Sequence, residues 1–95
     1  MSSNKVLLTL FTHADCQLCK LAKANLFKVQ QKVPFLIEEV DIKLPENKYW
    51  FEEYKYDIPV VHANGKFLLW HQVNVEKTIQ KLNNLKAQNT ENTEL

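Results

Sequence analysis

Cys16 and Cys19 are the only two cysteines of the chain, and two residues separate them. A pair at this spacing suits one of three roles: a reactive dithiol, half of a metal site, or the packing of two small side chains. A zinc site usually needs a second pair of ligands, and the sequence contains no second C-x-x-C and no H-x-x-x-H. The residues therefore favour the dithiol and leave the other two roles open.

The three histidines are the other side chains that could exchange protons near neutral pH. His13 lies three residues before Cys16, and from the residues alone it can be a solvated loop histidine. We expect His62 to point outward from a strand and His71 to lie in the loop after a strand. Neither of these two is assigned a role.

A helix is predicted to begin at the cysteine pair. From Cys16 onward, Cys19, Ala22, Leu26 and Val29 recur at intervals of three and four residues, which is typical of the buried stripe of an amphipathic helix. The unpaired amide groups at a helix N-terminus stabilise a thiolate and lower the pKa of a cysteine from about 8.5. Cys16 is placed to receive this effect, whereas Cys19 lies one turn further along the buried stripe.

Strands are predicted on both sides of this helix. The apolar segments 5–12 (KVLLTLFT) and 34–42 (PFLIEEVDI) have the character of buried strands, and Pro34 prevents the helix from continuing. A strand, helix, strand unit of this size is normally a right-handed parallel crossover. The cysteine pair is thus expected at the junction between the first strand and the first helix.

The next segment, 44–56 (LPENKYWFEEYKY), can form a helix with Pro45 in its first turn. We expect this helix to bury three aromatic side chains, namely Tyr49, Trp50 and Tyr54. All the aromatic residues of the segment are expected to pack in the protein and not to form a base-stacking platform: they are Tyr49, Trp50, Phe51, Tyr54 and Tyr56.

A hairpin is predicted from segments 58–63 (IPVVHA) and 66–70 (KFLLW), which are joined at Asn64-Gly65. This dipeptide is the strongest short signal for a two-residue turn, and Gly65 is the only glycine of the chain. A glycine placed where a turn needs a positive φ supports the hairpin.

The last helix is predicted to start at about Asn74, a suitable N-cap, and to end near Lys86. The remaining segment is polar. We therefore expect one domain over residues 1–86 and a disordered tail over residues 87–95.

Length and charge limit the classes of function. A chain of 95 residues makes one domain, and no apolar run approaches the roughly 20 residues of a membrane helix. Twelve basic residues, all lysine, balance eleven acidic residues, so we expect no nucleic acid and no membrane as partner. The N-terminal residues lack a secretory signal, and we expect an intracellular protein, cytoplasmic or mitochondrial.

The order β-α-β-α-β-β-α, with C-x-x-C at the first βα junction and Pro59 opening the third strand, resembles the thioredoxin superfamily and, within it, the glutaredoxins. The resemblance covers residues 5–86. The segments CQLC and YKYDIPVV are similar to those of short glutaredoxin-like proteins that carry C-x-L-C and a tyrosine followed by I-P-V. The resemblance implies a thioredoxin-like α/β fold, with a four-stranded mixed sheet flanked by helices.

The resemblance also implies a thiol–disulfide oxidoreductase. In this chemistry Cys16 attacks a substrate disulfide and Cys19 resolves the mixed disulfide, which leaves a redox-active Cys16–Cys19 disulfide. The resemblance implies a cis peptide bond before Pro59, which would present the backbone of Ile58 to an extended substrate. His13 occupies the position of a lysine that often aids the thiolate and glutathione in glutaredoxins. The substrate site implied in this way consists of His13, Ile58 and Pro59.

One departure from the glutaredoxin pattern concerns glutathione. Glutaredoxins commonly carry a glycine pair after the last strand at the glutathione site, where this chain has the bulky Trp70 and His71. We expect no resident cofactor or metal ion, and glutathione, as the candidate co-substrate, should bind weakly. The expected partner of a monomeric protein is a disulfide-containing protein or a glutathione mixed disulfide. Two alternatives remain: a metal or iron–sulfur binding module, and a non-catalytic binding domain that keeps the fold.

Overall fold

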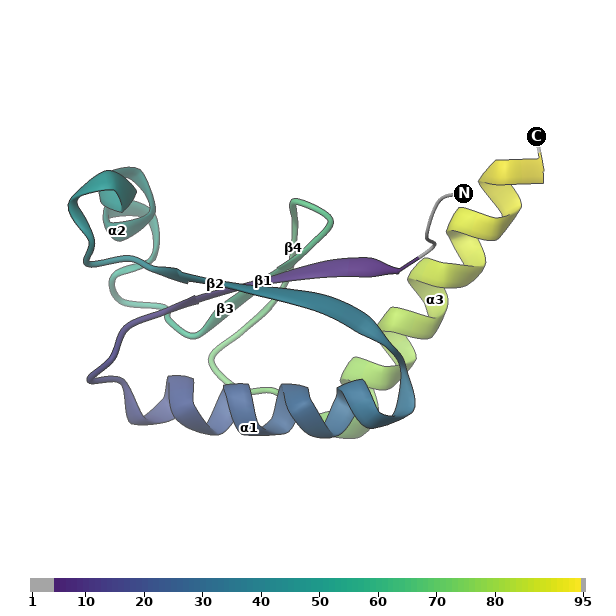
Figure 1. The fold of residues 1–95 in the computed structure, drawn as a ribbon, viewed down its shortest axis with the longest axis horizontal. Helices are drawn as coiled ribbons and strands as arrows, with labels where there is room; N and C mark the ends of the chain where they lie inside the picture. Colours follow the sequence, from purple (N-terminus) through teal and green to yellow (C-terminus); the bar gives the residue numbers. More distant parts are fainter. Residues whose placement is uncertain (1–4, 95) are drawn as a thin grey trace.

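The structure, a computed structural model, describes the backbone of residues 5–94 and the side chains of residues 5–86. Its elements confirm the predicted order, with one short 3-10 helix added (Figure 1). They are β1 (Val6–Thr12), α1 (Gln17–Lys32), β2 (Phe35–Asp41), η1 (Pro45–Asn47), α2 (Lys48–Tyr54), β3 (Val60–Ala63), β4 (Lys66–Trp70) and α3 (Val75–Glu94). Within the described part of the chain, no helix is long and apolar enough to cross a membrane.

The four strands form the predicted mixed sheet, in the order β2-β1-β3-β4. Strand β1 is parallel to β2, with Thr12 opposite Asp41, and antiparallel to β3, with Phe11 opposite Val60. Helices α1 and α3 lie on one side of the sheet, and α2 lies on the other side near one end (Figure 1). The ends of β1 and β2 and the start of β3 therefore meet at one edge of the sheet.

The main core lies between the sheet and helices α1 and α3. Alternate residues of β1 point to this side because successive side chains of a strand face opposite ways. The predicted stripe of α1 meets them, and all four of its residues are buried: Cys19, Ala22, Leu26 and Val29. Residues of all these elements join in one cluster, which includes Leu8, Leu10, Leu26, Val61 and Leu82.

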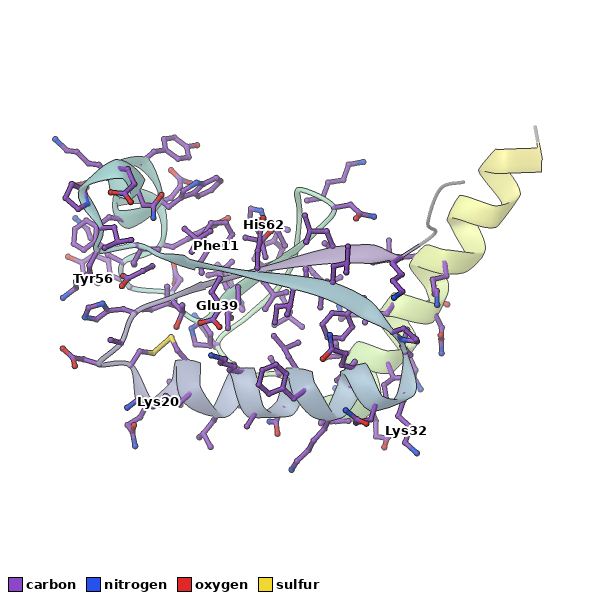
Figure 2. All side chains as sticks on the ribbon, in the orientation of Figure 1. Phe11, Lys20, Lys32, Glu39, Tyr56 and His62 are labelled. Atoms are coloured by element: carbon purple, nitrogen blue, oxygen red, sulfur yellow. A yellow bond between two sulfur atoms is a disulfide. The ribbon has the colours of Figure 1, made fainter. Side chains whose placement is uncertain are left out.

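A second cluster lies on the other side of the sheet, under α2. Phe11, Ile42 and Val60 are its buried members, and the side chains of Trp50 and Tyr54 from α2 pack against them. The Phe11 ring centroid lies 4.6 Å from that of Trp50. Figure 2 shows Phe11 on the side of the sheet that carries α2. This cluster fixes α2 close to the edge where the three strand ends meet.

Two predictions about the aromatic segment were wrong. Tyr49 is 66% exposed and Tyr56 is 87% exposed, so neither packs in the core. The helix has only seven residues and offers one face to the sheet. Trp50 and Tyr54, four residues apart, share that face, whereas Tyr49 is turned away from it by about 100°. Tyr56 follows the end of the helix, where no second layer covers it.

The prediction that His62 points outward was also wrong. His62 is 8% exposed, because the face of β3 that it occupies is covered by α2. Its Nε2 atom lies 2.7 Å from the Tyr54 hydroxyl, and its ring contacts Phe11 and Trp50 edge-on. Burial lowers the pKa of His62 and raises the pKa of Tyr54. His62 thus belongs to the second cluster, together with the side chains that hold α2.

The hairpin and the N-cap of the last helix are confirmed. Asn64 and Gly65 have φ values of 52° and 83°, which suit a two-residue turn. The Oδ1 atom of Asn74 accepts the amide of Lys77 at 2.9 Å, as an N-cap does. Helix α3 continues to Glu94, beyond the end expected near Lys86. The division of the chain into residues 1–86 and 87–95 stays a prediction.

Candidate dithiol site

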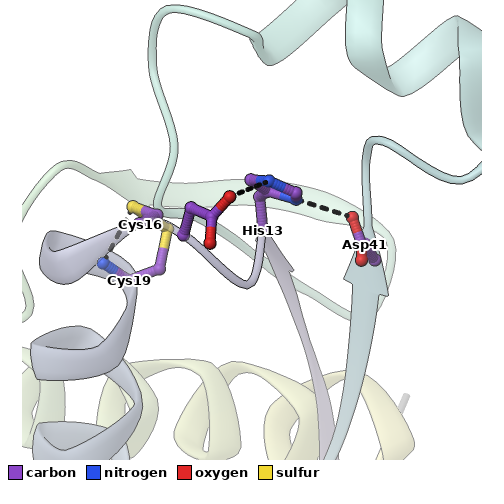
Figure 3. Close-up of a disulfide and its surroundings, with 5 residues drawn as sticks. His13, Cys16, Cys19 and Asp41 are labelled. Carbon is purple, nitrogen blue, oxygen red and sulfur yellow. Dashed lines mark hydrogen bonds and ion pairs between the residues drawn. A yellow bond between two sulfur atoms is a disulfide. The ribbon is translucent and has the colours of Figure 1, made fainter.

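Cys16 and Cys19 form a disulfide at the start of α1, with their Cα atoms 5.2 Å apart (Figure 3). Cys16 is the N-cap residue of the helix, and its Sγ atom accepts the backbone amide of Cys19 at 3.0 Å. The first helical hydrogen bond runs from the amide of Lys20 to the carbonyl of Cys16. The sequence therefore places one sulfur where the helix has unpaired donors.

The two cysteines differ in exposure. Cys19 is 1% exposed, because it begins the stripe of α1 that faces the core. Cys16 is only half-buried, since the N-cap lies outside that stripe. Cys16 is therefore in contact with solvent, whereas Cys19 is shielded from it.

His13 lies between two carboxylates next to the cysteines (Figure 3). Its Nδ1 atom is 3.3 Å from Asp41 Oδ1, and its Nε2 atom is 3.5 Å from Asp15 Oδ2. The His13 side chain is 19% exposed, so it is not a freely solvated loop residue. A hydrogen bond from the Lys43 amide, helped by His13, lowers the pKa of Asp41 despite its partial burial.

Asp41 was not among the residues predicted for the site. The parallel pairing of β1 and β2 sets Asp41 opposite Thr12, one residue before His13. The sequence did contain a signal for Asp41: this carboxylate lies at the end of the second predicted strand, and parallel strands end at the same edge of a sheet. A hollow of about 470 Å³ lies here, and its walls include His13, Cys19, Lys20 and Asp41.

The peptide bond between Ile58 and Pro59 is cis, as the resemblance implied. Pro59 is buried and directly precedes Val60, which pairs with Phe11, so the antiparallel register brings it beside Thr12. The Ile58 amide already donates to the Tyr54 carbonyl at 3.2 Å. The loop before β3 is therefore held at the same sheet edge as the loop that carries the cysteines.

Trp70 and His71 form a wall after β4. Their rings stack at 5.0 Å with 6° between the planes, and His71 Nε2 lies 3.4 Å from Asp57 Oδ1. The His71 backbone has φ 70°, and the Gln72 amide donates to the Trp70 carbonyl at 2.8 Å. This is a γ-turn of the rare kind with positive φ. His71 lies in the loop after the strand, as predicted.

The sequence of this chain is similar to those of known proteins. A profile of the glutaredoxin-like domain family (DUF836) matches residues 7–83. The chain belongs to this family. The curated "Glutaredoxin-like protein YDR286C homolog" of Dictyostelium discoideum is 33% identical to this glutaredoxin-like chain over 82 aligned residues, and the alignment covers 82% of this chain and 76% of the relative.

Solved structures agree with the thioredoxin-like fold of this glutaredoxin-like chain. Protein Ne2328 of Nitrosomonas europaea superposes with a TM-score of 0.72 at 23% identity, covering 86% of this chain and 96% of that protein. Thioredoxin-2 of the malaria parasite superposes with a TM-score of 0.62 at 18% identity, covering 84% and 82% of the two chains. At these identities the likeness shows the fold alone.

The metal-site alternative depends on further ligands close to the cysteine pair. Among the residues whose side chains the structure describes, no three or more His, Cys, Asp and Glu residues are grouped so that they could hold a metal ion. His13, the histidine nearest the cysteines in sequence, faces two carboxylates. The cysteine pair of this glutaredoxin-like chain therefore has no third ligand from its described part.

Proposed function

We propose that this glutaredoxin-like protein is a thiol–disulfide oxidoreductase in which Cys16 is the nucleophile and Cys19 is the resolving thiol. The observation that carries the proposal is the difference between the two sulfur atoms. Cys16 is half-buried at the helix N-terminus and accepts an amide hydrogen bond, whereas Cys19 is 1% exposed. A thiolate is favoured at the first position and shielded from outside reagents at the second.

The reaction takes two exchange steps. The Cys16 thiolate attacks one sulfur of a substrate disulfide, so that a bond between Cys16 and the substrate forms, the substrate S–S bond breaks, and the leaving thiolate takes a proton from solvent. Cys19 then loses its proton and attacks Sγ of Cys16, which forms the Cys16–Cys19 disulfide and releases the second substrate thiol. The substrate gains two electrons and the protein dithiol loses two. An external thiol reductant restores the dithiol.

The Cα separation of 5.2 Å between the cysteines suits the second step, because it falls within the range of protein disulfides. His13 has a supporting role in the proposal: when protonated, it adds positive charge beside the thiolate, and Asp41 holds its ring in place. The loop of Ile58 and Pro59 is proposed to meet the substrate chain next to the reacting sulfur. A substrate strand there would pair with the Ile58 backbone or replace its hydrogen bond to Tyr54.

Trapping of the mixed disulfide tests these roles. Purified Cys19→Ser and Cys16→Ser variants are incubated with a disulfide-bonded peptide and analysed by non-reducing mass spectrometry. Cys19→Ser should accumulate a covalent adduct through Cys16, because the second exchange step is blocked. Cys16→Ser should form little adduct. Adducts on Cys16→Ser alone would reverse the roles, and a wild-type protein that reduces no disulfide would overturn the proposal.

A further inference from the structure

Another hollow, of about 610 Å³, lies at the start of α1, where Leu18 lines it. Leu18, one of the two residues between the cysteines, forms one wall, and the loop before Pro59 and the end of β4 with the loop after it form the others. A neighbouring hollow of about 170 Å³ shares Leu18, His71 and Gln72 with the first and continues along α1 to Asn25. These two joined hollows are called the Leu18 groove below.

The walls of the Leu18 groove contain both polar and apolar side chains, and several large apolar ones are accessible. Leu18 and Trp70 are each 50% exposed, Leu21 is 62% exposed, and Tyr56 is 87% exposed. Large apolar side chains that gather on a surface mark a binding site more often than scattered ones do. Leu18 lies within one helical turn of both Cys16 and Cys19, so one wall of the groove belongs to the segment that carries the cysteine pair.

The charge of the groove does not suit glutathione. Its walls, as far as the structure describes them, contain no lysine, aspartate or glutamate, and His71 already faces the Asp57 carboxylate. Glutathione carries two carboxylates and an ammonium group near neutral pH, and such groups need charged or hydrogen-bonding partners when water is removed. The lysines near the cysteines, Lys20 and Lys23, line the hollow beside His13 instead.

The aromatic wall of the groove is held firmly. The Trp70 and His71 rings stack on each other, the His71 amide donates to the Pro59 carbonyl at 2.7 Å, and Asp57 lies beside the imidazole. Several contacts thus oppose a movement that would open space for a polar tripeptide. A wall that is fixed before binding loses little conformational freedom when an apolar ligand packs on it.

We infer that the Leu18 groove selects polypeptide disulfides that carry a large apolar residue next to the reacting cysteine, and that it disfavours glutathione. The inference rests on the proposed function, because it concerns the substrate of the same cysteine pair. From Leu18 to Asn25, α1 rises by about 10 Å, the length of about three residues of extended chain. A short stretch of polypeptide fills this length and supplies the apolar surface that the walls accept.

The rates at which the protein reduces three small disulfides provide the test. The probes are disulfide-linked homodimers of a capped tripeptide X-Cys-Ala, with X as leucine or alanine, and oxidised glutathione. Second-order rates of reduction by the reduced protein are measured for each. The leucine dimer should react about ten- to a hundredfold faster than the alanine dimer and oxidised glutathione, as expected for apolar contacts in a binding site.

Three variants show whether the groove causes the preference. Trp70→Ala and Leu18→Ser should bring the ratio of leucine to alanine rates close to one. Trp70 lies on β4 and Leu18 lies on α1. If circular dichroism shows that one variant does not fold, the rate ratio of the other variant still tests the inference. Tyr49→Ala is the matched control, because Tyr49 is an exposed aromatic residue outside the groove, and it should keep the wild-type ratio.

Equal rates for the two dimers would overturn the inference, as would fastest reduction of oxidised glutathione or an unchanged ratio in both groove variants. In all these cases the reduction would still require Cys16, and the proposed function would stand. A wild-type protein that reduces none of the probes faster than Cys16→Ser does would overturn the proposed function and the inference together.

Discussion

The backbone amide of Cys19 donates a hydrogen bond to Sγ of Cys16 over 3.0 Å. One residue thus supplies both the buried sulfur and the donor that faces the accessible sulfur. The spacing of the pair follows from this geometry, because an N-cap side chain reaches the amide three positions further along. The relationship makes the two thiols chemically unequal before any substrate binds.

The first prediction concerns alkylation. Cys16 should react with iodoacetamide at least several-fold faster than Cys19, and the midpoint of its pH dependence should lie below about pH 7.5. The rates are measured on reduced Cys19→Ser and Cys16→Ser, each with one remaining thiol, by mass spectrometry from pH 5 to pH 9. Equal rates, or a faster Cys19, would contradict the assigned roles.

The second prediction concerns His13. His13→Gln should slow alkylation of Cys16 by about two- to fivefold at pH 6, the size of effect expected for a partly exposed charge pair. Tyr49→Ala is the control, because Tyr49 is an exposed residue outside the site, and this variant should alkylate at the wild-type rate. An equal rate at pH 6 would assign His13 to structure alone.

The third prediction concerns stability and His62. Burial lowers the pKa of His62 in the folded protein, whereas the unfolded side chain takes up a proton below about pH 6.5. As the pH falls below that value, the unfolded state binds more protons than the folded state, so the free energy of unfolding decreases until the folded pKa is passed. Above about pH 6.5 both forms are neutral and the contribution is complete.

Urea unfolding at pH 7.5, 6 and 5 measures this loss of stability. His62→Phe should unfold with a weaker dependence on pH between 7.5 and 5 than wild type. Asp41 affects the free energy of unfolding at lower pH. Because its pKa is lowered in the folded protein, the stability that its carboxylate contributes is lost only below about pH 4. The same pH dependence in His62→Phe and wild type would show that His62 is accessible to protons in the folded state.

The fourth prediction concerns the hairpin turn. Gly65 has φ 83°, and a Cβ atom added there would meet no other atom within 4 Å. Gly65→Ala should therefore lower the free energy of unfolding by about 1–2 kcal/mol, the backbone cost of a left-handed residue. Gly65→Asn should lose less, because asparagine tolerates this conformation. Chemical denaturation measures both, and an equal loss in the two variants would point to a cause other than the backbone.

Local patterns in the sequence were enough to predict the elements and the position of the cysteine pair. Helix α1 was predictable because its buried stripe of Cys19, Ala22, Leu26 and Val29 repeats at the period of a helix, and that period is a local property. The hairpin was predictable from Asn64-Gly65, which is also a local signal, because few residues accept a positive φ. The placing of Cys16 at a helix start needed only this local pattern.

Other features of the site and of the sheet could not be predicted from local patterns. Asp41 reaches His13 because β2 pairs with β1 in one register, and His62 is buried because α2 packs on that face of the sheet. Tyr49 and Tyr56, with the same type of side chain as the packed Tyr54, remain exposed. Strand register and the choice of covered face arise from contacts between distant segments, so hydrophobicity along the chain could not fix them.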